Sequence, residues 1–258
     1  MYLEKYDLKG RLAVVTGGGQ GIGLACAQAL GEAGAKIVVA ELLPDRVESA
    51  VAELKNLGLD AAGVPLDVTK SSQVDEAAAA IKREHGAVSI LVNNAGVAKS
   101  DVRAEDTSDE HWRFHMDVNL DGLFWCCRAF GRQMLEAGKG SIVNIGSMSG
   151  IIVNKPQPQS FYNASKAAVH HLTKSLAAEW GPRGVRVNAV APTYIETPLT
   201  RFGMEGSPEM YKVWLEMTPM GRVGQPEEIA STVLFLASDA ASLLTGSIVL
   251  ADGGYTCW

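Results

Sequence analysis

The stretch RLAVVTGGGQGIG, residues 11–23, joins a short apolar run to a glycine-rich loop and then to a helical segment. Gly17 lets the chain turn tightly, Gly21 leaves room for a pyrophosphate against the backbone, and Gly23 lets helix and strand pack closely. The N–H groups that begin the helix attract phosphate. The loop lacks the Lys-Ser/Thr ending of a triphosphate-binding loop, so it predicts a dinucleotide site. A structural turn without a ligand is the alternative.

The alternation of apolar runs and helical stretches continues along the chain. Further strands are expected at 36–40, 61–66, 89–93, 140–146, 185–190 and 247–251, and helices at 21–33, 44–57, 71–85, 109–137 and 162–181. Buried strands separated by helices form a parallel sheet that is covered on both faces. The sequence therefore predicts one α/β domain over 1–258, with a doubly wound, seven-stranded parallel sheet of Rossmann type.

Composition and charge limit the classes of partner that the protein is expected to bind. The net charge of −6 and the lack of a Lys/Arg cluster argue against nucleic acid, and no apolar run is long enough to cross a membrane. The N-terminus has no apolar core of signal-peptide type. We expect Cys26, Cys126, Cys127 and Cys257 to be reduced, buried thiols, because none has metal-site spacing. A cytoplasmic protein is predicted.

One connection is longer than the fold requires. Residues 192–225 carry Met, Phe, Trp and Tyr at helical spacing between the sixth strand and the next helix. They predict either a lid over a substrate or a helical hairpin that packs on the core or on a second subunit.

The end of the second strand favours NAD over NADP. Glu41 stands where a carboxylate can accept hydrogen bonds from the adenosine ribose hydroxyls and repel a 2′-phosphate. Leu42 and Leu43 supply no cation for such a phosphate. Alternatively, Glu41 only begins a capping turn before Pro44.

The motifs TGGGQGIG (16–23), NNAG (93–96) and YNASK (162–166) together resemble those of the short-chain dehydrogenase/reductase family, and the match covers nearly the whole chain. The resemblance implies a nicotinamide cofactor and a homotetramer. Its catalytic residues correspond to Asn119, Ser147, Tyr162 and Lys166, with Ser149 as a rival for the serine. We expect the cofactor to contact Gly17, Gln20, Gly21, Ile22, Gly23, Glu41, Asp67, Val68, Asn94, Ala95, Gly96, Tyr162, Lys166, Pro192, Ile195 and Thr197.

The chemistry centres on a tyrosine four residues before a lysine. A free phenol has a pKa of ~10, and an exposed ammonium contributes ~1 kcal/mol or less toward lowering it. The pair must therefore be partly desolvated, and the positive nicotinamide must add to the field. Tyr162 would then take the hydroxyl proton of an alcohol, while Ser147 holds the same oxygen. Lys166 would hold the ribose. A mere surface pair is the alternative.

By the same resemblance, Asn119 would help a water chain to carry the proton out, or it is a buried amide that closes a helix kink. His111 and His115 have the spacing of metal ligands but lack a third ligand, so no metal is expected. His170 and His171 are expected to be structural or exposed. Thr193 stands where the family has glycine after Pro192.

The loop 150–161 is extended relative to the family and should form a wall of the substrate pocket. Its amides, together with the Ser149 hydroxyl, suit a substrate with several hydroxyl groups. We expect Ser147, Ser149, Asn154, Gln157 and Tyr162 to contact it. The surrounding segments look like those of polyol dehydrogenases, which interconvert sugar alcohols and ketoses. A solvated turn is the alternative.

Two other functions would share part of this sequence pattern. A 3-oxoacyl carrier-protein reductase or other carbonyl reductase would commonly use NADP, against which Glu41 argues. A nucleotide sensor would keep the fold without the tyrosine, lysine and serine, and all three are present. At the C-terminus, Tyr255 and Trp258 are expected to pack against the protein or a neighbouring subunit.

Overall fold

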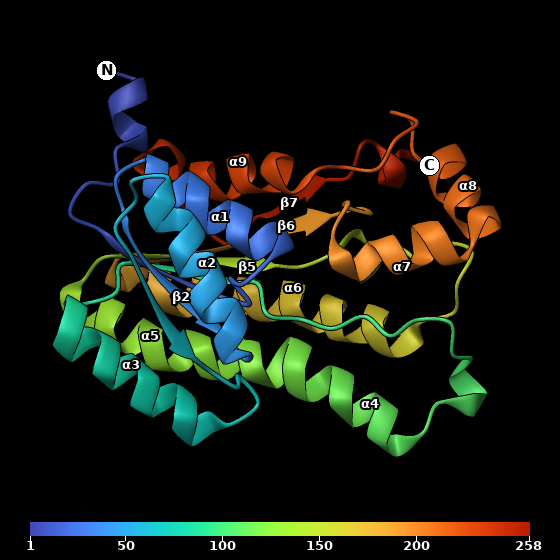
Figure 1. Ribbon diagram of the computed structural model, residues 1–258, viewed down its shortest axis with the longest axis horizontal. Coiled ribbons are helices and arrows are strands. Elements are labelled where there is room, and N and C mark those ends of the chain that lie inside the picture. The colour runs from blue at the N-terminus through green and yellow to red at the C-terminus, as the bar shows by residue number, and fades with distance from the viewer.

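The computed structural model describes residues 1–258, apart from the side chain of Phe202. Its centre is a parallel sheet with the strand order β3-β2-β1-β4-β5-β6-β7 (Figure 1). The strands are β1 (Leu12–Thr16), β2 (Lys36–Glu41), β3 (Ala61–Pro65), β4 (Ile90–Asn93), β5 (Gly140–Ile145), β6 (Val185–Pro192) and β7 (Ile248–Ala251). All seven expected strands are present, so the predicted doubly wound sheet is confirmed.

Helices cover both faces of the sheet (Figure 1). One layer holds α1 (Gly21–Glu32), α2 (Pro44–Asn56) and α9 (Pro226–Ala237), and the other holds α3 (Ser71–His85), α5 (Leu123–Ala137) and α6 (Ser160–Trp180). Side chains alternate along a strand, so Val15 packs in the first layer and Val14 in the second, both fully buried. Each such side chain stabilises the fold by roughly 1.5–3 kcal/mol.

The helix expected at 109–137 is interrupted. α4 (Asp109–Met116) and α5 are joined by a wide π-type turn over Asp117–Gly122. The cause is Asn119, which lies inside this turn and is 1% exposed. Its Oδ1 accepts a hydrogen bond from the Val97 N–H at 2.8 Å, and its Nδ2 donates to the Val97 carbonyl at 3.0 Å. The amide therefore closes a helix kink and fastens the segment after β4 to it.

The connection 192–225 folds into two short helices, α7 (Pro198–Gly206) and α8 (Pro208–Met217). α8 is anchored by Trp214, whose ring stacks on Tyr194 with centroids 3.9 Å apart. Tyr255 lies edge-on to Tyr194 and is 1% exposed. The C-terminus thus packs within its own chain through Tyr255, whereas Trp258 remains exposed. The hairpin packs on the core, while α7 borders the cleft described below.

The four cysteines are not all buried. Cys26, Cys126 and Cys127 are buried free thiols, whereas Cys257 is exposed beside the C-terminus, contrary to expectation. Across the described part of the chain, no helix combines the length and apolar character that a membrane crossing requires.

Candidate active site

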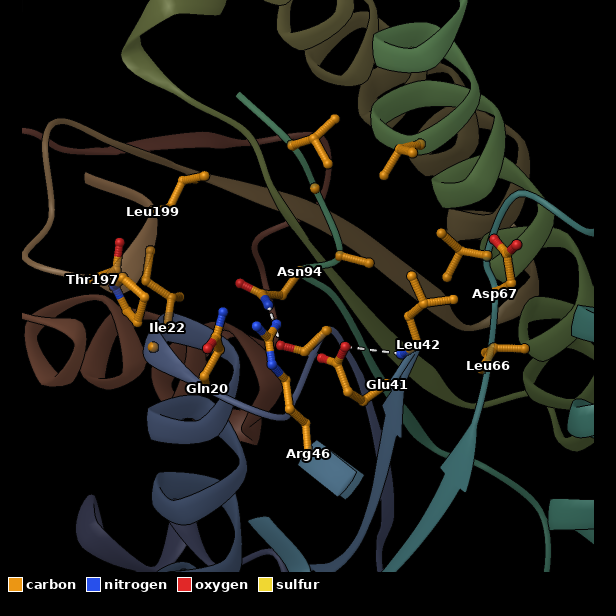
Figure 2. Close-up of a pocket in the computed structure, with 18 of the residues that line it drawn as sticks. Gln20, Ile22, Glu41, Leu42, Arg46, Leu66, Asp67, Asn94, Thr197 and Leu199 are labelled. Atoms are coloured by element: carbon orange, nitrogen blue, oxygen red, sulfur yellow. Dashed lines mark hydrogen bonds between the residues drawn. The ribbon is translucent and has the colours of Figure 1, made fainter. Parts of the chain in front are cut away.

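A cleft of about 350 Å³ opens at the carboxyl ends of β1 and β4 (Figure 2). The chain connections leave these two neighbouring strands toward opposite sides, and such a switch point is where open α/β sheets bind ligands. Of the expected cofactor residues, the following line this cleft: Gly17, Gln20, Gly21, Ile22, Glu41, Asp67, Val68, Asn94, Ala95, Gly96 and Thr197.

Asn94 holds the glycine loop in place. Its Nδ2 donates to the carbonyls of Thr16 at 3.2 Å and of Gly17 at 2.8 Å. Gly17 has a φ of 59°, and a Cβ there would lie 2.9 Å from the Ala95 Cα, so only glycine fits. Gly23 does not line the cleft. It packs against the Gly17 carbonyl oxygen, which would lie only 2.2 Å from a Cβ atom at position 23.

The start of α1 fits a pyrophosphate. Within the described structure, no side chain caps the helix at Gln20, so its first N–H groups face the cleft without a side-chain acceptor. A Cβ at Gly21 would press against the Thr197 side chain at 3.2 Å. The loop therefore offers backbone donors and an unobstructed approach, which are the features that a dinucleotide phosphate needs.

Glu41 closes one end of the cleft and is 7% exposed. Its carboxylate accepts hydrogen bonds from the N–H groups of Leu42 at 2.9 Å and Gly19 at 3.3 Å. Arg46 of α2 borders the same end, near Glu41 and Gln20 (Figure 2). Leu42 and Leu43, the two residues after Glu41, give no sign of this cation. The first turn of the helix that follows β2 would have been the place to look.

A second hollow of about 130 Å³ adjoins the cleft. Its lining includes Ser147, Tyr162, Lys166, Pro192, Thr193 and Ile195. The two spaces share the lining residues Asn94, Gly96 and Thr197, so they lie next to each other. The strand ends of β5 and β6 and the first turns of α6 thereby bring the expected catalytic tyrosine, lysine and serine to the expected dinucleotide site.

Lys166 is buried and Tyr162 is half-buried, so the two do not form a surface pair. The Lys166 side chain is 6% exposed, and its Nζ donates to the Ile145 carbonyl at 2.8 Å and lies 5.8 Å from the centre of the Tyr162 ring. Burial lowers the pKa of Lys166 to about 8. Burial also raises the pKa of Tyr162, and a hydrogen bond with Ser147 offsets this only in part. Burial alone therefore disfavours the phenolate form of Tyr162. A further positive charge nearby would be needed to lower the pKa of this phenol.

The geometry favours Ser147 over Ser149. The Ser147 side chain lines the cavity, interacts with Tyr162 and accepts the Ser149 N–H at 3.1 Å. The Ser149 hydroxyl instead donates to Asn154 Oδ1 at 2.9 Å. Only Ser147 therefore has its oxygen in the cavity that contains the tyrosine.

The amides of the loop 150–161 form a buried network. Asn154, Gln157 and Gln159 are 4%, 6% and 6% exposed, which contradicts a solvated turn. The Tyr194 hydroxyl accepts from Asn154 Nδ2 and from Gln157 Nε2 at 2.6 and 3.0 Å, and Gln159 Nε2 donates to Asn154 Oδ1 at 3.0 Å. In this structure the expected substrate residues Ser149, Asn154 and Gln157 thus bond to their neighbours, and none of the three is in the cavity lining.

The histidine pair on α4 is structural. His115 is fully buried, its Nε2 accepts the Lys99 N–H at 3.1 Å, and its ring packs on Phe161. The pKa of His115 is lowered, chiefly by burial. The described residues contain no group of His, Cys, Asp and Glu that could hold a metal ion.

The motifs and this geometry match a known family. A family model described as "Enoyl-(Acyl carrier protein) reductase" matches residues 17–256. The chain belongs to the short-chain dehydrogenase/reductase family.

Its relatives align over the full length. The galactitol 2-dehydrogenase of Rhizobium johnstonii is 55% identical, with 100% of this chain and 99% of the relative covered. The L-tagatose-forming galactitol 2-dehydrogenase of Cereibacter sphaeroides is 50% identical over the same shares. The crystal structure of gox2181 superposes with a TM-score of 0.99 at 56% identity, covering both chains completely. A gluconate 5-dehydrogenase from Burkholderia cenocepacia, solved with NADP and tartrate, covers both chains completely with a TM-score of 0.94 and 34% identity.

The loop network generates a stability prediction. Tyr194→Phe removes the acceptor of two buried amide donors, so we expect the free energy of unfolding to fall by roughly 1–3 kcal/mol. Tyr211→Phe is the matched control, because the Tyr211 ring also contacts Trp214 and its hydroxyl makes no hydrogen bond to the described residues. Urea unfolding of both variants measures the difference. Equal stability of the two variants would contradict the importance of this hydroxyl.

Proposed function

We propose that this protein oxidises a secondary hydroxyl group of a sugar alcohol to a ketose with NAD, as a single catalytic domain over 1–258. The proposal is supported chiefly by the hollow lined by Ser147, Tyr162 and Lys166, which adjoins the dinucleotide cleft and shares lining residues with it. Two relatives at 55% and 50% identity are named galactitol 2-dehydrogenases. They favour a polyol substrate over the alternative 3-oxoacyl or other carbonyl substrate.

The protein groups would work as an acid–base set. Tyr162 Oη takes the proton of the substrate hydroxyl, and Ser147 Oγ holds the same oxygen by a hydrogen bond. When bound, NAD supplies the hydride acceptor. Lys166 raises the local positive potential and holds the nicotinamide ribose from its place against the Ile145 carbonyl. Asn119 would connect the proton path to solvent through the kinked helix.

Other groups would bind and enclose the ligands. The glycine loop holds the pyrophosphate, Glu41 the adenosine ribose, and Asp67 with Val68 the adenine. Thr197 and the Ile195 backbone hold the carboxamide, and the α7–α8 hairpin acts as a lid. Its first helix begins at the cavity rim, where Thr197 caps it by accepting the Thr200 N–H.

The cellular context is a further part of the proposal. Three buried free thiols suit a reducing cytoplasm. The exposed Trp258 and the half-exposed β7 edge at Leu250 suit assembly into a homotetramer.

The reaction is tested with a panel of C4 to C6 polyols, apolar secondary alcohols and 3-oxoacyl thioesters. We expect NADH formation with polyols, and a fall in kcat of roughly 100-fold or more for Tyr162→Phe, because the proton acceptor is lost. Binding of NADH to this variant, measured by fluorescence, should persist. Turnover of apolar alcohols or thioesters but of no polyol would contradict the proposed substrate class.

Cofactor preference depends on two opposed charges at the end of the cleft. Glu41 would repel a 2′-phosphate, whereas the Arg46 guanidinium at the same end could bind one. The gluconate 5-dehydrogenase from Burkholderia cenocepacia, solved with NADP, makes this second charge relevant. Glu41→Gln keeps a hydrogen-bond acceptor for Gly19 but removes the charge. We expect the ratio of kcat/KM for NAD to that for NADP to fall by roughly tenfold or more.

Arg46→Gln serves as the companion variant. Added to Glu41→Gln, it should restore discrimination against NADP by removing the cation that the phosphate would use. A wild-type protein that prefers NADP would contradict the role of Glu41.

A further inference from the structure

A buried imidazole lies beneath the turn that carries Ser147. His170 follows Lys166 by one helical turn on α6 and is 5% exposed. Its Nε2 lies 3.4 Å from the Ser147 backbone nitrogen and accepts that N–H. The ring therefore faces the backbone of the site rather than solvent.

The turn is shaped around this ring by two glycines. A Cβ at Gly146 would lie 2.3 Å from His170 Nε2, and one at Gly150 would lie 2.8 Å from His170 Cε1. Neither glycine has a positive φ, so backbone conformation does not demand glycine at these positions. At Gly146 the imidazole occupies the space that a side chain would need, whereas at Gly150 the Lys166 backbone, 2.7 Å from the Cβ position, excludes a side chain together with the imidazole.

The ring is held in its neutral form. Burial, followed by the charges of Lys166 and Lys174, lowers the pKa of His170 to about 4, against a small opposing effect of the Gly150 backbone. A neutral imidazole that accepts at Nε2 carries its proton on Nδ1. Nδ1 is buried and has no partner of ordinary hydrogen-bond geometry among the described residues.

The turn itself is a small unit. The Gly150 N–H donates to the Ser147 carbonyl at 3.0 Å, and the Ser149 N–H donates to Ser147 Oγ at 3.1 Å. Moving the Ser147 backbone would therefore move its hydroxyl as well. The imidazole ties this unit to α6, the same helix that carries Tyr162 and Lys166.

We propose that His170 is a positioning residue for Ser147, which it acts on through the backbone of the 147–150 turn. Its Nε2 acceptor and its ring volume keep the Ser147 hydroxyl aligned with Tyr162 in the cavity. This inference rests on the proposed role of Ser147 in the alcohol reaction.

The test compares three substitutions. His170→Gln places an amide oxygen near the position of Nε2 and can still accept the Ser147 N–H. His170→Leu fills space without an acceptor, and the side chain of His170→Asn is too short to reach. His171→Leu is the matched control, because His171 is exposed on the same helix. The measurements are kcat and KM for the best polyol, the Kd for NADH, and hydrogen–deuterium exchange of residues 147–150.

We expect His170→Leu and His170→Asn to lose roughly tenfold or more in kcat and to exchange faster over 147–150, with the Kd for NADH unchanged. His170→Gln should recover most of both properties, and His171→Leu should change neither. If His170→Leu does not fold, His170→Asn decides the outcome.

Two results would overturn the inference. If kcat and hydrogen–deuterium exchange are unchanged in the Leu and Asn variants, His170 does not position Ser147. If the Gln and Leu variants lose kcat equally, the Nε2 acceptor has no role and His170 only fills space. Ser147→Ala in the same assay separates the positioning role of His170 from the proposed role of Ser147. If Ser147→Ala is inactive while the Leu and Asn variants of His170 stay fully active, the positioning role alone is refuted. A wild-type protein inactive on every polyol refutes the proposed function, while the exchange data still test the turn.

Discussion

The site depends on a charged amine that the fold keeps out of water. The Lys166 ammonium is buried against the Ile145 carbonyl, and burial lowers its pKa from 10.5 to about 8, equivalent to about 3 kcal/mol. A single carbonyl oxygen compensates poorly for lost hydration, so the site is built at a cost to stability. In the proposed reaction this buried charge would favour a phenolate at Tyr162, because charges interact more strongly where little water screens them.

The same burial acts in the opposite direction on Tyr162. Desolvation raises the pKa of the phenol, and the Ser147 hydrogen bond does not cancel the effect. Exclusion of water therefore strengthens the effect of every charge in the cavity, but it also disfavours the negative charge of a Tyr162 phenolate, which the proposed reaction needs. The cationic ring of an oxidised nicotinamide is the group that would reverse the balance. On this account the tyrosine becomes a base only when the dinucleotide cleft is filled, which would couple proton removal to cofactor binding.

Much of this arrangement could be predicted from the sequence. The apolar runs around Val14 and Val92 predict the strands, and the glycines after β1 predict the dinucleotide-binding turn. Both patterns can be recognised because they reflect constraints between residues close together in the chain. The interruption of the helix at Asn119 was foreseen only as an alternative, because it depends on the Val97 backbone, which is distant in the chain.

The features that local sequence does not reveal are long-range partners. Asn154 and Gln157 are polar loop residues, which usually meet solvent or ligand. In the structure their partner is Tyr194, 40 and 37 residues away. The contact between His170 and the Ser147 backbone is likewise invisible in the sequence, since the two residues belong to different elements. Local spacing reveals which residues share a helix face, but not which element covers that face.

The most direct test of the account is an ultraviolet titration of the Tyr162 phenolate, obtained as the difference between the wild-type protein and Tyr162→Phe, with and without NAD⁺. We predict that the midpoint in the free protein lies above that of an ordinary phenol, because burial raises the pKa of Tyr162, and that it falls clearly when NAD⁺ is bound. A midpoint that NAD⁺ does not move, or one already near neutrality in the free protein, would contradict it.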